Sequence, residues 1–401
     1  MRMLAGQMAQ KFSVRYAESL DSVAAEAWDA CANPVGLPDS VGERHNPFVS
    51  HAFLSALEQS NSVGARSGWI PAHALVEDPQ GRLVACAPTY IKMHSLGEYV
   101  FDQNWAQAYE RAGGRYYPKI QVAAPFTPVT GRRLLVAPNA PQGTREALID
   151  ALEELRRETD GSSIHVTFCT DEERVALCGA GFVHRTGEQF HFVNDGYADF
   201  EDFLARLTAR KRKAIKRERR EALGDDLKID LLTGDSILPQ HWDSFFAFYM
   251  ETGARKWGRP YLTRAFFDEI GARMADRVLL VMARRGERHI AGAINFLGDD
   301  AIYGRNWGAL EALPFLHFEV CYYQAIEFAI RHGYRRVEAG AQGEHKLARG
   351  YRPAITHSAH RFADPRLGEA VSAFLMRERA AIEEWAAEHA AELPYKVEND
   401  G

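Results

Sequence analysis

The sequence predicts an α/β protein of two tandem domains, each a mixed β-sheet flanked by helices. Three observations predict this class: the chain repeats itself, both copies share one order of strand-like and helix-like segments, and the composition is globular. Of the 401 residues, 46% are hydrophobic and 25% are charged. A chain of this length can bury a hydrophobic core in each of two domains.

The internal repeat is clearest at residues 46–57 and 259–270, which read NPFVSHAFLSAL and RPYLTRAFFDEI. Both segments run proline, aromatic, aliphatic, hydroxyl, any residue, alanine, phenylalanine, bulky apolar. Further pairs in the same order are Trp28 with Trp242 and residues 81–91 with 287–297. A repeat of this kind indicates a duplicated structural unit.

Each copy is expected to contain the same elements in the same order. The order is a strand, a helix, a short helix, a β-hairpin, a further strand, a long helix, a fifth strand, another helix and a last strand. The hairpins turn at Gly81 and Gly286, and the last strands follow Gly181 and Gly350. The first strands, hairpins, long helices and fifth strands fall in paired ranges: 11–17 and 227–232, 72–92 and 278–298, 144–159 and 318–333, 162–169 and 335–341.

The repeat divides the chain into four predicted segments. They are an N-terminal domain of residues 11–195, a basic connecting helix of 196–225, a C-terminal domain of 226–365, and a C-terminal helix and tail of 366–401. The order of elements in each domain is that of the acyltransferase fold usually called GNAT.

Two GNAT domains in tandem, with a basic helix that opens the second, resemble the Fem family of peptidoglycan-branching aminoacyltransferases. More closely, the chain resembles a Fem-like group of bacterial predicted N-acyltransferases, often labelled peptidoglycan biosynthesis proteins. The segments that carry this resemblance, across nearly the whole chain, are residues 94–119, 254–262, 314–329 and 338–351. They read HSLGEYVFDQNWAQAYERAGGRYYPK, ARKWGRPYL, PFLHFEVCYYQAIEFA and EAGAQGEHKLARGY.

The resemblance implies transfer of an acyl or aminoacyl group to an amine, with aminoacyl-tRNA or acyl-CoA as donor and a nucleotide-linked peptidoglycan precursor as one acceptor. Neither copy carries the Arg/Gln-x-x-Gly-x-Gly/Ala loop with which GNAT enzymes usually cradle the CoA pyrophosphate. This absence favours aminoacyl-tRNA but leaves an acyl-CoA-dependent N-acyltransferase of a small molecule as an alternative. A second alternative is a non-catalytic tandem GNAT module that binds RNA or a protein partner.

The two copies differ most after their fifth strands. Residues 170–182 of the first copy read as an ordinary capped helix, whereas residues 341–351 of the second combine glycines with charges. Acyl transfer needs an acceptor for the proton of the amine and a positive charge beside the oxygen that becomes an oxyanion. The candidates are Lys346 or Arg349 for the charge, Glu344 and His345 for proton relay, and Tyr351 for the leaving group.

The resemblance bears on the choice of cation. In the Fem enzymes, the oxyanion role is assigned to a lysine in a Phe-Lys-x-Gly-Phe-like segment after this strand. Here the spacing differs, because Lys346 precedes Gly350 by four residues while Arg349 adjoins it. The assignment therefore stays open between Lys346 and Arg349, and a glycine-rich surface loop with ion-paired charges is the alternative interpretation.

The helix before the fifth strand and the strand before that helix hold further candidates. His317 and Glu319 lie in the first turn of the helix, where its dipole favours a carboxylate. A structural role is the alternative for His317. In the strand, Tyr303, Arg305 and Trp307 are expected to alternate onto one face, with Tyr303 and Arg305 binding substrate.

Residues 94–119 are too long for a plain connection and too aromatic for a disordered one. They predict a wall of the substrate site, with a packing insertion at the domain interface as the alternative. The candidates in this wall are Tyr99, Asp102, Trp105, Tyr117 and Lys119. The resemblance also implies an acceptor-phosphate region near Arg255, Lys256 and Arg264.

Residues 208–221, TARKRKAIKRERRE, hold eight basic and two acidic residues in a chain of net charge −6. Lysine and arginine clusters bind phosphates mainly by charge, so this segment predicts a docking site for transfer RNA or a nucleotide-linked substrate. A solvated helix is the alternative. The candidate phosphate-binding residues are Arg210, Lys211, Arg212, Lys213, Lys216 and Arg217.

The remaining composition narrows the protein class. Five cysteines, an odd number without Cys-x-x-Cys pairing, favour a reducing compartment and argue against structural zinc. No apolar run reaches the roughly 18 residues of a membrane helix, and the N-terminus lacks the apolar core of a signal peptide. We expect a cytoplasmic protein without a metal cofactor, whose oligomeric state the sequence leaves open.

Overall fold

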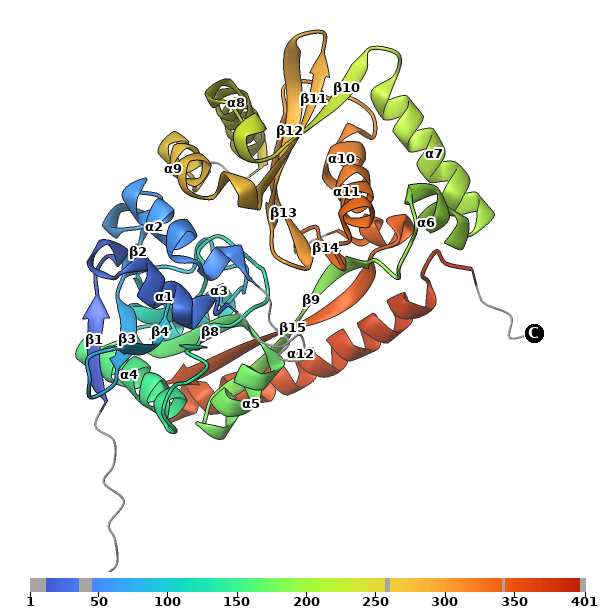
Figure 1. Cartoon of the computed structure of the whole chain (residues 1–401). Helices are drawn as coiled ribbons and strands as arrows, with labels where there is room; N and C mark the ends of the chain where they lie inside the picture. Colours follow the sequence, from blue (N-terminus) through green and yellow to red (C-terminus); the bar gives the residue numbers. More distant parts are fainter. Residues whose placement is uncertain (1–11, 36–44, 257–259, 341–342, 397–401) are drawn as a thin grey trace, which may run out of the picture.

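The computed structural model describes residues 12–35, 45–256, 260–340 and 343–396. For residues 254–256 and 391 it describes the backbone alone. Figure 1 shows two halves, each with helices packed around strands, joined by two long strands and a long C-terminal helix.

The N-terminal half contains the expected elements in their expected order, together with short strands and a helix that the sequence did not predict. The strands are β1 (Ser13–Ala17), β2 (Trp69–Pro71), β3 (His73–Glu77), β4 (Leu83–Ala87), β5 (Thr89–Lys92), β6 (Lys119–Val122), β7 (Leu135–Val136), β8 (Ser163–Cys169) and β9 (Val183–Val193). The helices are α1 (Ala25–Ala32), α2 (His51–Gln59), α3 (Gln103–Arg111), α4 (Thr144–Glu158) and α5 (Asp171–Gly179).

The C-terminal half repeats this order after a helical connection. The strands are β10 (Leu227–Leu232), β11 (Val278–Arg285), β12 (Arg288–Leu297), β13 (Ala301–Ala309), β14 (Arg336–Glu338) and β15 (Arg352–Phe362). The α-helices are α6 (Phe200–Arg206), α7 (Ala209–Leu223), α8 (Pro239–Lys256), α9 (Arg264–Met274), α10 (Leu316–Phe318), α11 (Gln324–His332) and α12 (Pro365–Ala391). A π-helical turn, η7 (Glu319–Tyr323), joins α10 to α11, and a 3-10 helix, η8 (Glu344–Arg349), precedes β15.

The strands form two sheets. The larger has the order β10-β11-β12-β13-β14-β9-β15-β8-β6-β5-β2, and the smaller has the order β1-β3-β4-β7. The larger sheet is mixed, because β13 pairs parallel with β14 and β6 pairs parallel with β8, while its other neighbours are antiparallel. Mixed strands flanked by helices are the fold class that the sequence predicts.

β9 and β15 tie the two halves together. They pair antiparallel from Arg352↔His191 to His360↔Val183. The end of β9 also pairs with β14, and the end of β15 also pairs with β8. Each long strand is therefore the last strand of its own repeat in the sequence, but it pairs with strands of the other repeat. One sheet thus runs through both halves, and the predicted domain boundaries stay predictions.

The repeated motif forms matching helix starts. Ser50 and Thr263, its hydroxyl residues, are the N-caps of α2 and α9, and each accepts a hydrogen bond from the backbone N–H three residues on. Those N–H groups belong to Phe53 and Phe266, whose buried rings lie 5.8 Å apart between centroids. The two helices therefore pack together in one core, which also buries both tryptophans of the repeat.

Two cores cover the two faces of the C-terminal strands. One includes α8 and α9, and the other includes α6, η7 and α11. Tyr303 packs in the first core, whereas Trp307 contacts the second. They lie on opposite faces because β13 holds an extra residue, Arg305, between the partners of Ile294 and Asn295. The expected alternation of Tyr303, Arg305 and Trp307 onto one face is therefore wrong.

The basic helix α7 packs one face against the C-terminal half (Figure 1). Ile215 and Ala222 supply the buried apolar positions of this face. Glu218 and Arg219 also point inward, where they form ion pairs with η8 and η7 respectively. Part of the charge of α7 therefore serves to fasten the helix.

Candidate active site

A pocket lies where two parallel strands of the C-terminal half diverge. β13 and β14 pair from Ala301↔Arg336 to Tyr303↔Glu338 and then separate. The adjoining pocket has a volume of about 70 Å³, which suits a narrow group rather than a whole cofactor. Its lining includes Asn295, Arg305, Trp307, His317, Cys321 and Tyr322.

The bulge in β13 brings Arg305 into this lining. The Arg305 guanidinium donates to the carbonyl oxygen of Phe126 and lies 5.6 Å from the centre of the Tyr99 ring. Its other N–H groups have no partner among the described residues. Asn295 donates to the Leu279 carbonyl at 3.3 Å, and its buried Oδ1 has no partner in the same part of the chain. The pocket therefore offers both hydrogen-bond donors and an acceptor.

A second wall of the pocket comes from α10 and η7. Single π-turns of this kind are frequent at functional sites. The centre of the His317 ring lies 4.5 Å from the centre of the Trp307 ring and 5.2 Å from that of the Tyr322 ring. The Tyr322 hydroxyl is 2.9 Å from Nε2 of His345. Because burial raises the pKa of Tyr322, its hydroxyl stays protonated at neutral pH and can donate a hydrogen bond.

Lys346 is buried beside the pocket. It is 1% exposed, and its Nζ donates at 2.7 Å to the carbonyl oxygen of Gly340, the residue after pocket-lining Ala339. Burial lowers the pKa of Lys346 to about 7, because removal from water disfavours the charged ammonium. The charge expected for this lysine is therefore present only in part at neutral pH.

Arg349, the rival cation, is engaged elsewhere. Its guanidinium donates to both carboxylate oxygens of Glu218 at 2.9 Å and to the His345 carbonyl at 2.6 Å. It also lies 3.4 Å from the centre of the Phe318 ring. Charge-assisted contacts of this kind are strong and orienting, so they fasten η8 to α7.

Three further predicted catalytic residues do not line the pocket. Glu319 is fully buried and accepts hydrogen bonds from Arg219 at 2.9 and 3.0 Å. Tyr351 is also fully buried, its hydroxyl has no partner among the described residues, and burial raises its pKa. Glu344 is exposed on η8.

The structure thus brings two predicted residues, His317 and Arg305, into one pocket. It adds Tyr322 and Asn295, which sequence reasoning missed. Tyr322 is hidden in the sequence by an apolar helical pattern, and the π-turn that turns it toward the pocket has no sequence signal. Asn295 does carry a signal, because it is a polar residue inside an apolar strand.

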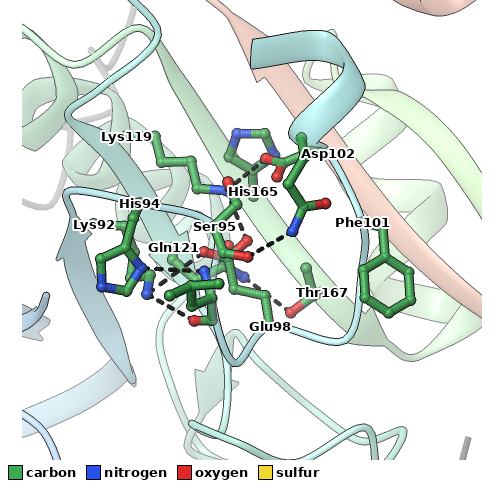
Figure 2. A network of polar contacts seen from close by, with 12 residues as sticks. Lys92, His94, Ser95, Glu98, Phe101, Asp102, Lys119, Gln121, His165 and Thr167 are labelled. Atoms are coloured by element: carbon green, nitrogen blue, oxygen red, sulfur yellow. Dashed lines mark hydrogen bonds and ion pairs between the residues drawn. The ribbon is translucent and has the colours of Figure 1, made fainter. Parts of the chain in front are cut away.

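Residues 94–119, the predicted substrate wall, point their buried side chains into the N-terminal half, and Figure 2 shows Glu98, Asp102 and Lys119 among them. Asp102 and Lys119 are buried and hydrogen-bonded to each other. Tyr117 bonds to a serine hydroxyl at 2.8 Å, and Trp105 packs in a small core with α12. Tyr99 is the candidate that extends to the pocket, where it contacts the guanidinium described above.

The predicted acceptor-phosphate residues are placed only in part. The side chains of Arg255 and Lys256 lie outside the described residues. Arg264 begins α9 and forms ion pairs of 2.7 Å with Asp243 and Asp268. Its charge is therefore matched by two carboxylates.

Comparison with known proteins relates this arrangement to one family. Residues 19–397 match the FemAB-like family, described as peptidoglycan biosynthesis/recognition. The chain belongs to the FemAB-like family. The resemblance stated from the sequence is confirmed, while no curated protein matches the chain.

Solved structures show the fold of this FemAB-like chain. FemX superposes with a TM-score of 0.53 at 11% identity, over 87% of this chain and 98% of FemX. A conserved protein of unknown function from Bacteroides thetaiotaomicron superposes with a TM-score of 0.52 at 11% identity, over 87% of this chain and 99% of that protein. A tandem GNAT protein from the clavulanic acid biosynthesis pathway gives 0.48 at 14% identity, over 88% and 99%. The likeness to FemX confirms the predicted fold class.

The basic helix α7 of this FemAB-like chain has an exposed, cationic start. Among the described residues, no carboxylate pairs with the four cations of its first turns: Arg210, Lys211, Arg212 and Lys213. Lys216 and Arg217 are paired with glutamates at 2.6 and 3.6 Å. The Arg217 guanidinium lies 6.0 Å from the Phe315 ring, just before the helix that carries His317.

Two other features are absent from the described part of this FemAB-like chain. Its helices include none that is both long and apolar enough to cross a membrane. Nor do three His, Cys, Asp or Glu side chains gather there in a group that could hold a metal ion.

Proposed function

We propose that this protein is an N-acyltransferase that moves an acyl or aminoacyl group onto an amine in the pocket beside β13. The observation that carries the proposal is the divergence of β13 and β14. Beyond Tyr303, the β14 edge of β13 has no strand partner among the described residues. An extended substrate that contains amide groups, such as a peptide acceptor, can bond to such an edge as an added strand. The narrow pocket then receives its reactive group.

The side chains of the pocket suit the proton transfers of amide formation. The amine nitrogen attacks the donor carbonyl, a C–N bond forms, and the ester or thioester bond to the leaving group breaks. His317 accepts the proton of the amine and returns it to the leaving oxygen or sulfur. Tyr322 donates a hydrogen bond to the carbonyl oxygen as it becomes an oxyanion. With its proton on Nε2, His345 donates to the Tyr322 oxygen and leaves the Tyr322 proton for the substrate.

Lys346 adds positive charge beside this centre while it is protonated. It suits that role better than Arg349, because Arg349 is engaged with Glu218. Since burial lowers the pKa of Lys346 to about 7, a catalytic ammonium makes the activity fall as pH rises above about 7. A rise in activity over the same range, absent from Lys346→Met, would reassign the neutral amine as a base.

The proposed donor is an aminoacyl-tRNA. The cations at the start of α7, which no carboxylate of the described residues pairs with, offer a polyanion a binding surface next to the helix of His317. Binding of this kind depends strongly on salt, because bound phosphates release counterions. A nucleotide-linked peptidoglycan precursor is the proposed acceptor, in keeping with the description of the family.

The test is transfer itself. Purified protein is incubated with aminoacyl-tRNA or acyl-CoA and with amine acceptors, including a nucleotide-linked peptidoglycan precursor, and products are identified by mass spectrometry. We expect product from aminoacyl-tRNA, formed at least about 100-fold more slowly by His317→Ala. If neither donor class yields an amide product, the proposal is wrong, and product from acyl-CoA alone would replace the proposed donor.

A charge reversal tests the donor site separately. Arg210→Glu with Lys213→Glu should weaken tRNA binding about tenfold or more at low salt. Arg157→Glu, an exposed charge reversal on α4, is the control and should leave binding unchanged. Equal tRNA affinity of both variants would remove α7 from the proposed donor site.

A further inference from the structure

A buried network of charges holds part of the predicted wall in the N-terminal half (Figure 2). Lys119 donates to Glu98 at 2.7 Å and also to Asp102. The Lys92 ammonium lies 3.7 Å from Glu98 and 3.9 Å from the centre of the Trp69 ring. Two lysines and two carboxylates thus pair with one another away from water, and burial lowers the pKa of Lys92 to about 7. Buried charges are tolerated only in fixed, paired geometry, so the network fixes the course of residues 95–102.

Tyr99 lies in the middle of this fixed stretch and has an unusual backbone. Its φ is +59°, in the left-handed region that an aromatic residue rarely adopts. Such a conformation persists only where the surroundings over-determine it, and it is common at functional sites. Here the surroundings are the anchored neighbours Glu98 and Asp102. Gly97 adds close contact, because a Cβ there would lie 2.7 Å from the Phe126 ring.

Through Tyr99, the anchored stretch reaches the pocket of the C-terminal half. The Tyr99 ring lies 5.6 Å from the Arg305 guanidinium, which also donates to the Phe126 carbonyl. Arg305 is therefore held by a ring and by a carbonyl from the N-terminal half. Its remaining N–H groups have no partner among the described residues. A planar guanidinium with spare donors matches the geometry of a carboxylate or a phosphate.

We propose that Arg305 binds an oxyanion of the amine acceptor, a carboxylate or a phosphate, and that Tyr99 and the buried network position Arg305 for this task. The identity of the ligand as the acceptor rests on the proposed function. The binding of an oxyanion does not. Arg305 is then the binding residue, while Tyr99 and Lys119 act through it as positioning residues.

The first experiment needs no turnover. Acetate and inorganic phosphate, as separate probes at constant ionic strength, are titrated into the full chain and followed by calorimetry or NMR. We expect one of the two probes to bind the wild-type protein. The same probe should bind Arg305→Gln at least about tenfold more weakly, because this variant loses the charge-assisted contact. The preferred probe assigns the acceptor group as carboxylate or phosphate. If neither binds the wild type, or if Arg305→Gln binds equally well, the inference is wrong.

Substitutions at Tyr99 separate positioning from folding. Tyr99→Phe keeps the ring and should bind the probe within about twofold of the wild type. Tyr99→Gly removes the ring but adopts a positive φ without strain, so the variant should fold while affinity falls about tenfold. A folded Tyr99→Gly variant with wild-type affinity would exclude the positioning role.

The network is tested with Lys119→Met combined with Glu98→Gln, which removes one charge of each sign. We expect faster hydrogen exchange of residues 95–102 and a higher acceptor KM at unchanged kcat. Arg115→Met, exposed on the same segment, is the control and should alter neither quantity. Unchanged hydrogen exchange and acceptor KM in the double variant would exclude a positioning role for the network. A protein that binds the probe but transfers nothing keeps this inference and loses the proposed function.

Discussion

The N-terminal and C-terminal halves use the same structural opening in different ways. In both, a pair of parallel strands separates, β6 from β8 and β13 from β14. In the N-terminal half, residues 123–134 pack there, and the Arg133 guanidinium donates to the carbonyl oxygens of Thr167 at 3.0 Å and Val129 at 2.6 Å. In the C-terminal half, Arg305 lines a pocket and keeps N–H groups without partners among the described residues.

The difference shows how a duplicated fold can divide structure from chemistry. A buried guanidinium that donates to backbone carbonyls satisfies the hydrogen-bonding groups of the fold itself. A guanidinium with spare donors can instead bind a ligand. The helices that follow differ in the same sense. Thr170 and Glu173 form a complete capping box at the start of α5, while the corresponding η8 buries Lys346 at a cost in stability.

The largest expected effect is a loss of folding stability from a change in the N-terminal half. Arg133→Met leaves several buried carbonyl oxygens without donors, and we expect a loss of about 3–5 kcal/mol in the free energy of unfolding. Urea denaturation measures this loss. Arg305→Met, the matched change in the other half, should cost less than about 1 kcal/mol. Equal losses at both positions would erase the distinction between the halves.

The next effect concerns catalysis. His317→Ala removes the proposed proton acceptor from the pocket and should lower kcat by about 10²–10³-fold, with little change in the melting temperature. His165→Gln, at a buried histidine of the N-terminal half, is the control. It should lower stability while the folded protein retains its kcat. A comparable fall in kcat for both variants would contradict a site confined to the C-terminal half.

The smallest effect is a gain in stability at Lys346. Burial lowers the pKa of Lys346 to about 7 from 10.5, so between these pH values the unfolded chain binds more protons than the folded one. Stability therefore rises with pH across this window. Lys346→Met avoids the buried charge and should be more stable than the wild type by about 1–3 kcal/mol at pH 7. The advantage should vanish above about pH 10.

Thermal or urea unfolding across pH checks this sign. A Lys346→Met variant that is less stable than the wild type at pH 7 would show that the ammonium stabilises the fold. In that case η8 would resemble the capped α5 of the first copy, and the contrast between the two halves would weaken.

The sequence by itself determined the family, the duplicated order of elements and two residues of the pocket. These features depend on neighbours along the chain. The hydroxyl and phenylalanine of the repeated motif predict a capped helix because Ser50 meets the N–H of Phe53, and Thr263 that of Phe266, three residues later. His317 was predicted from its place in the first turn of a helix, and Arg305 from its place in a strand whose face was expected to meet the substrate.

Only the tertiary structure decided which polar groups are already matched. Arg349 meets Glu218, Glu319 meets Arg219, and Lys119 is enclosed between Glu98 and Asp102. The first two pairs join residues that lie about a hundred or more positions apart, so no local pattern records them. The bulge at Arg305 and the exchange of β9 and β15 likewise arise from strand pairing. A charge is free for chemistry only if folding leaves it unpaired, and folding pairs charges through space.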